Sequence, residues 1–281
     1  MYNLRYHITS LVAVFLALAI GLILGTVVVE RGYLDKQRTT LVQSLQSDFT
    51  GLRNENADLK RERDRDHAFA TDVVPLLIGG TMRGKTVLLI TNAGRNDAAA
   101  LARDVLRQAG ADVVVATLKA KNLGLDDPNV QKSVSGIVTL TPGGAGSGDP
   151  VAGLLASEWT KGGQQPLTDA LRSSGQLTVD GGSAGTHFDG VVLLASFDGQ
   201  PDPVLVALAA DMQKSGMPAV GVESQTVATG VSDAALGAGL SSVDDVDAPE
   251  GAVSLVYVLL GRAEGHYGVK AGATAAYPKL R

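Results

Sequence analysis

The chain has 281 residues, a formal net charge of −5, 45% hydrophobic residues and 19% charged residues. Proteins that bind nucleic acid hold phosphate with lysine and arginine, so this acidic balance, with no basic patch, argues against a nucleic-acid partner. Cysteine is absent, which excludes disulfides, thiolate metal ligands and cysteine nucleophiles.

The first predicted element is a membrane-spanning helix over Ile8–Val29, an uncharged and almost wholly apolar run. At a rise of about 1.5 Å per residue it spans roughly 33 Å, enough for a hydrocarbon core of about 30 Å. A cleaved signal peptide is the alternative, because Arg5 precedes the run and Ala17-Leu18-Ala19 resembles a cleavage site. The run continues well past Ala19, which favours an uncleaved anchor, and positive charges on both flanks leave its orientation undecided.

Small residues recur at every fourth position inside this span, at Ala13, Ala17, Gly21 and Gly25. Residues at this spacing share one helix face and let a second helix approach closely, where van der Waals contact holds membrane helices together. We therefore expect a transmembrane packing face. The alternative is that these positions reflect only the high content of glycine and alanine in membrane helices.

A short coiled coil is predicted between Arg38 and Asp66. Its dimer seam consists of two heptad positions, with Val42, Phe49 and Asn56 at one and Leu45, Leu52 and Leu59 at the other. An asparagine in a seam pairs best with the same residue of a second chain, so Asn56 favours a parallel homodimer. Tethering in the membrane raises the effective concentration of that partner. A single solvated helix is the alternative, and the alternating charges of Lys60–Asp66 resemble one.

The remaining roughly 200 residues suffice for one substantial α/β domain or two small ones. Apolar and β-branched runs predict strands at Thr86–Thr91, Ala111–Leu118, Gly136–Leu140, Val191–Phe197 and Ala219–Glu223. Helices are predicted at Asp97–Ala109, capped by Asn96, and at Pro203–Ser215 and Gly251–Leu260.

This alternation predicts an α/β fold, in which a transmembrane helix and a short coiled coil precede a mostly parallel, doubly wound α/β domain. The predicted parts are an anchor over residues 1–31, a coiled-coil stalk over 32–72 and the α/β domain over 73–281.

The loops expected at the carboxyl ends of the strands carry no standard nucleotide motif. The turn at residues 91–96 lacks GxGxxG, and the chain has no GxxxxGK[ST]. The glycines of Pro142–Gly148 form either an anion-binding nest or a plain connector. A small ligand in such glycine-rich loops stays open.

Gly181-Gly182-Ser183-Ala184-Gly185 matches the G-x-S-x-G pattern of hydrolases, with His266 downstream. That serine needs a strand before it and a helix after it, whereas residues 186–190 lead into a predicted strand. We therefore predict no catalytic residue and no cofactor, and interpret His187 as a loop or packing residue.

Metal ligands are equally sparse. The histidines are isolated from one another, at His7, His67, His187 and His266. The methionines show no repeated spacing, at Met1, Met82, Met212 and Met217. Soft Cu(I) prefers clustered Cys, Met or His, so copper is possible but unsupported by ligands. One acidic cluster, Asp244, Asp245, Asp247 and Glu250, precedes the last predicted helix. It could bind a hard cation but lacks the glycine and spacing of an EF-hand, so capping of that helix and interaction with its dipole are the expected roles.

The N-terminal run from Leu4 to Gly25 and the motif Gly265-His266-Tyr267-Gly268 resemble the actinobacterial MctB/SteB family, often called copper transporters. The order of anchor, coil and α/β domain matches that family along essentially the whole chain. The resemblance brings no catalytic residue with it.

This resemblance implies a single-pass protein of the cell membrane with its large domain outside the cytoplasm. One description of the family concerns copper efflux through an outer-membrane pore. Another concerns cell separation, as a partner of the membrane protein SteA and an activator of a peptidoglycan hydrolase.

Of these descriptions, the sequence favours a non-catalytic scaffold or regulator. A pore-forming β-barrel needs many alternating strands of about 9–11 residues, and a single helical span cannot enclose an aqueous path. Copper transport or homeostasis is the alternative.

Overall fold

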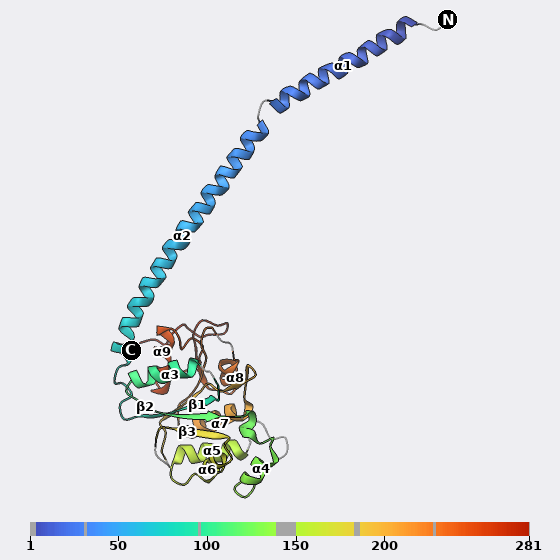
Figure 1. Ribbon diagram of the computed structural model, residues 1–281. Helices are drawn as coiled ribbons and strands as arrows, with labels where there is room; N and C mark the ends of the chain where they lie inside the picture. The colour runs from blue at the N-terminus through green and yellow to red at the C-terminus, as the bar shows by residue number, and fades with distance from the viewer. Residues whose placement is uncertain are drawn as a thin grey trace. The chain divides into compact units, whose positions relative to one another are not determined.

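The structure is a computed structural model that describes residues 4–30, 33–94, 97–138, 150–182, 186–226 and 229–280. The chain divides into two compact units, residues 1–66 and 67–281. Figure 1 shows consecutive helices in the first unit and a sheet with helices in the second.

The first unit is built from α1 (Leu4–Glu30) and most of α2 (Tyr33–Ile78). Residues 4–27 of α1 have a mean hydropathy of 2.6 and no buried side chain, so by length and composition this helix can cross a membrane. The predicted span at Ile8–Val29 lies wholly within α1. Helix α2 runs without interruption through the predicted stalk, and its last turns belong to the second unit.

A mostly parallel sheet forms the centre of the second unit, which confirms the predicted α/β class. Its described strands are β1 (Thr86–Asn92), β2 (Asp112–Leu118), β3 (Leu177–Asp180), β4 (Gly190–Leu193), β7 (Ala219–Val222), β8 (Ser241–Val243) and β9 (His266–Tyr267). They lie in the order β3-β2-β1-β4-β7-β8-β9, and β3 alone among them is antiparallel to its neighbour.

Helices cover both faces of this sheet (Figure 1). They are α3 (Asp97–Gln108), α4 (Pro128–Val134), α5 (Pro150–Lys161), α6 (Pro166–Ser173), α7 (Pro203–Lys214), α8 (Val231–Gly237) and α9 (Pro249–Leu259), with the 3-10 turn η1 at Lys121–Gly124. Figure 1 shows α3 and α9 on one side of the sheet and α5 and α6 on the other.

The alternation of side chains along β1 shows how the sheet divides the core. Leu88 and Ile90 pack with α5, α6, α7 and α8, whereas Val87 and Leu89 pack with α3 and α9. Because successive residues of a strand point to opposite faces, a strand buried on both sides reads as a continuous apolar run. The last turn of α2 contributes Ile78 to the second of these cores.

Most predicted elements of this unit agree with the structure to within a few residues, but two strand predictions need correction. The predicted strand Val191–Phe197 ends at Leu193, and Ser196–Phe197 (β5) pairs instead with Gln200–Pro201 (β6). The Asp-Gly pair between β5 and β6 has positive φ at both residues, 53° and 68°, as a tight hairpin turn requires.

The predicted strand Gly136–Leu140 is wrong over its described residues, 136–138. The amides of Ile137 and Val138 donate to the carbonyl of Val134 at the end of α4, so the chain forms a turn there. Residues 139–140, the Asn96 cap and the loop Pro142–Gly148 lie outside the described residues.

Candidate functional site

The small residues predicted as a packing face lie along α1. Ala13, Ala17, Gly21 and Gly25 are all exposed, like the rest of the described helix. A Cβ atom built on Gly21 or Gly25 would meet no atom within 4 Å. The single chain therefore leaves this face open for another helix.

The predicted coiled-coil seam forms an exposed apolar stripe on α2. Its apolar members expose a large part of their surface, namely Val42 59%, Leu45 49%, Phe49 67%, Leu52 60% and Leu59 59%. Asn56 is exposed among them. Among the described residues of this unit these side chains are exposed to water, and apolar surface of this extent is typical of an interface.

A polar cluster occupies the carboxyl edge of the sheet in the second unit. Glu223 directly follows β7, Asp244 and Asp245 follow β8, and His266 lies on β9. Open α/β sheets bind ligands at this edge, most often where the strand order reverses. Here the reversal lies between β1 and β4, because the chain continues from β1 to β2 on one side and places β4 on the other.

Glu223 joins three segments of chain through one buried carboxylate. Its Oε1 accepts hydrogen bonds from the Thr229 hydroxyl at 2.6 Å and from the Val231 amide at 2.6 Å, and its Oε2 pairs with the Lys270 ammonium. Burial alone would raise the pKa of Glu223, but the hydrogen bonds from Lys270 and Thr229 outweigh it and hold the pKa below its usual value. The carboxylate is thus ionised and fully paired.

Asp244 and His266 form a second buried pair, in which Nε2 and Oδ2 lie 2.6 Å apart and the side chains are 0% and 2% exposed. The Asp244 carboxylate also accepts the amide of Val269 at 2.9 Å. A Cβ on Gly268 would overlap Asp244 Oδ1, so only glycine fits there. The motif Gly265–Gly268 therefore anchors the last strand to the end of β8.

Side-chain capping of α9 by this acidic cluster is wrong for the described contacts, whereas Glu250 does lie in the first turn of α9, where a carboxylate interacts favourably with the helix dipole. The residue that caps α9 is Ala248, which offers no side-chain hydrogen bond. Asp244 is turned toward His266 instead, and Asp247 accepts the amide of Gln225 at 2.8 Å. Sequence proximity to a helix start suggested capping, whereas the neighbouring strands supply the real partners.

Asp245 is the one member of this cluster with a large pKa shift. Burial raises its pKa to about 7, and the negative charges of Asp244, Glu250 and Asp247 add to the shift. Its Oδ1 has no hydrogen-bond partner among the described residues. The Asp245 carboxyl packs against the backbone of Gly251 in the first turn of α9, so its ionisation is opposed by the surrounding structure.

A pocket of about 240 Å³ lies at the same edge, next to Glu223. Its wall includes Asn92 at the end of β1, Ser196 beyond β4, and Thr229. The amide, hydroxyl and carboxylate groups can form hydrogen bonds with a small polar molecule. Glu223 itself is already paired, so the edge holds the fold together more than it offers a reactive group.

The residues considered for hydrolysis or metal binding are not brought together where the structure describes them. Ser183 lies outside the described residues. His187 Nδ1 contacts the Thr160 carbonyl at 2.8 Å, and His266 is buried against Asp244. Within the described ranges, no group of three or more His, Cys, Asp or Glu side chains could hold a metal ion.

Comparison with known proteins gives one consistent result. The family described as "Copper transport outer membrane protein, MctB" matches residues 1–278. Similar proteins named "Copper transporter MctB" occur in Mycobacterium bovis and in Mycobacterium tuberculosis H37Rv. Each is 28% identical, over 97% of this chain and 98% of the relative. No solved structure matches the chain.

Proposed function

The chain belongs to the MctB family of membrane envelope proteins, and we propose that it acts there as a dimeric, non-catalytic scaffold or regulator. The observation that carries the proposal is the exposed stripe of α2. Leu52, for example, is 60% exposed in a single chain, although leucine is normally buried. A parallel second copy would cover the whole stripe and pair Asn56 with Asn56.

The membrane helix supports the same proposal. An uncleaved α1 would hold two chains in one bilayer, and its small residues would let the two helices approach closely. The membrane helix and the coiled coil then reinforce each other, because pairing of one segment raises the effective concentration at which the other segment meets its copy. We place the α/β unit outside the cytoplasm, as the resemblance to the MctB/SteB family implies.

The absence of cysteine makes this proposal directly testable. Leu52→Cys places a thiol in the seam, whereas Asn54→Cys, two residues away, places one on the opposite side of the helix. In a parallel dimer, mild oxidation of membranes should cross-link Leu52→Cys efficiently and Asn54→Cys poorly. Equal or absent cross-linking of the two variants would contradict the dimer.

The proposed partners are a SteA-like membrane protein and, through it, a peptidoglycan hydrolase. A scaffold acts through a binding surface and needs no reactive group. The α/β unit agrees with this role, because most of its described acidic groups are paired within the unit. Affinity purification of the full chain from membranes, with mass spectrometry of the bound proteins, should recover the SteA-like protein. Recovery that survives Leu52→Asp unchanged, a variant that places charges in the seam, would separate partner binding from dimerisation.

Copper handling is the second candidate, because the matching family and both relatives carry copper in their descriptions. If the chain binds copper itself, the purified protein should retain Cu(I) or Cu(II) after dialysis, and a deletion strain should be copper-sensitive. A protein without bound copper and a strain with normal copper tolerance would rule this candidate out.

A further inference from the structure

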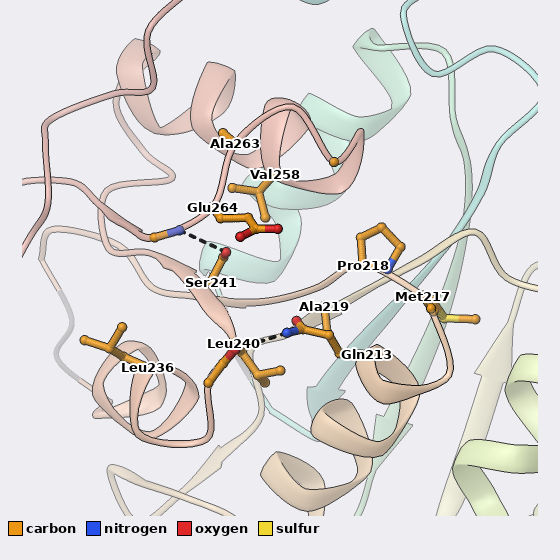
Figure 2. A pocket seen from close by; sticks show the side chains of 14 residues that line it. Gln213, Met217, Pro218, Ala219, Leu236, Leu240, Ser241, Val258, Ala263 and Glu264 are labelled. Atoms are coloured by element: carbon orange, nitrogen blue, oxygen red, sulfur yellow. Dashed lines mark hydrogen bonds between the residues drawn. The ribbon is translucent and has the colours of Figure 1, made fainter.

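A larger pocket lies at the opposite, amino edge of the sheet, with a volume of about 420 Å³. Ala219 at the start of β7 and Ser241 at the start of β8 form its floor. The C-terminal ends of α7, α8 and α9 surround that floor (Figure 2). Helices from both faces of the sheet therefore meet at one cavity.

Three helices end at this pocket. Gly216, Gly239 and Gly261, which line the pocket, follow α7, α8 and α9 and have φ values of 88°, 77° and 66°. Left-handed glycines of this kind end helices. The end of a helix carries a partial negative charge, equivalent to about half an elementary charge for a long helix. Most of the effect comes from α7 and α9, because α8 is short.

A carboxylate adds a full negative charge to the same place. Glu264 lines the pocket, and Figure 2 shows its side chain directed over the floor, with Val258 and Ser241 beside it in this view. The described lining contains no lysine, arginine or histidine. Of the basic residues next to the lining in sequence, Lys214 pairs with Asp211, His266 is buried against Asp244, and Arg262 lies over the Tyr257 ring.

The rest of the wall is apolar and held in place. Its apolar side chains are Met217, Pro218, Leu236, Leu240 and Val258. The Gln213 side-chain amide donates to the Gly239 carbonyl at 3.0 Å, and the Ser241 hydroxyl accepts the Gly265 amide at 3.1 Å. These bonds, drawn in Figure 2, tie α7 to the end of α8 and β8 to the start of β9.

We propose that this pocket binds a small organic cation, a primary ammonium group carried on a short apolar chain. The ammonium would lie against Glu264 and the helix ends, and the carbon chain against the apolar wall. A bare divalent cation fits less well, because hard cations need several oxygen ligands and the described lining offers one carboxylate. This inference is independent of the proposed scaffold role.

Methionine methyl groups provide the test, because Met217 lines the pocket whereas Met82 lies in the core on the other face of the sheet. The full chain, labelled with ¹³C-methyl methionine in detergent micelles, is titrated with n-pentylammonium. The Met217 signal should shift saturably, with a dissociation constant on the order of millimolar, while Met82 stays unchanged. Neutral 1-pentanol should bind at least about threefold more weakly, and pentanoate should not bind.

Matched variants locate the charge. Glu264→Gln should weaken pentylammonium binding about three- to fivefold, the range of an exposed ion pair. Glu250→Gln, at the other end of α9, removes the same charge and should leave binding unchanged. A Met217 signal that does not shift, equal shifts of Met217 and Met82, equal binding of pentanol, or unaltered binding by Glu264→Gln would overturn the proposal.

Discussion

The two units of this chain treat apolar side chains in opposite ways. In the α/β unit, Leu89 on β1 is 0% exposed beneath the helices of one face, whereas Leu52 on α2 is 60% exposed. Both leucines follow a regular pattern, one of a buried strand and one of a heptad. The α/β unit therefore completes its own core, whereas the stalk presents an apolar surface of the kind that a partner covers.

The largest effect on the α/β unit is expected from Asp244→Ala, which leaves His266 buried without its partner. We expect a loss of about 3–5 kcal/mol in the free energy of unfolding. Denaturant unfolding of the full chain, followed by fluorescence of the single tryptophan, Trp159, measures it, because this residue is buried in the α/β unit. Asp247→Ala, an exposed neighbour, should cost less than about 1 kcal/mol. Similar losses for both variants would contradict the role of the buried pair.

A pair of leucine truncations tests the contrast between the units directly. Leu89→Ala should lower the free energy of unfolding of the α/β unit by about 2–5 kcal/mol, because it opens a cavity in a closed core. Leu52→Ala should change the same free energy by no more than about 0.5 kcal/mol. Trp159 fluorescence again reports the transition. If Leu52→Ala lowered the free energy of unfolding of the α/β unit as much as Leu89→Ala, the stability of that unit would depend on the stalk.

Asp245 makes the stability of the α/β unit depend on pH. Its folded pKa is about 7 against an ordinary value of 3.8, so the folded state keeps a proton that the unfolded chain releases. The stabilising contribution is complete below about pH 4 and is lost as the pH rises to 7. Asp245→Asn stays neutral, and should therefore be more stable than the natural chain at pH 8 and similar to it at pH 4. Parallel pH profiles of the two proteins would exclude this role of Asp245.

The smallest effect is expected in the membrane helix. A Cβ atom on Gly21 meets no atom of another segment within 4 Å, so Gly21→Leu should leave the chain folded but weaken pairing of two chains by about 1 kcal/mol. Förster transfer between labelled chains in lipid vesicles measures this change. Ile23→Leu, which lies off the small-residue face, is the control and should leave transfer unaltered.

Sequence patterns predicted the elements with a strong apolar signal but missed two helices, α5 and α6, although α5 is as long as α3. The apolar runs of β1, β2 and β7 and the stripe of α3 carry their own signal. Short or polar elements do not: β8 has three residues, two of them serine, and β9 has two. Such strands are held by their neighbours, so no local pattern marks them.

The carboxyl-edge cluster was harder to predict for the same reason. Asp244 and His266 are 22 residues apart, and Glu223 and Lys270 are 47 apart. They meet only because β7, β8 and β9 are adjacent in the sheet. No local sequence pattern predicts that strand order. A usable signal did exist for Glu223, which directly follows the short apolar strand β7, where a buried carboxylate needs a partner.

The most direct test of the difference between the units is the mass of the full chain in lipid nanodiscs, measured by light scattering with the lipid contribution subtracted. We expect a protein mass about twice the 28.9 kDa of one chain, and a shift toward the mass of one chain when Gly21→Leu and Leu52→Ala are combined. A protein mass equal to that of one chain for the natural protein would contradict the proposed dimer.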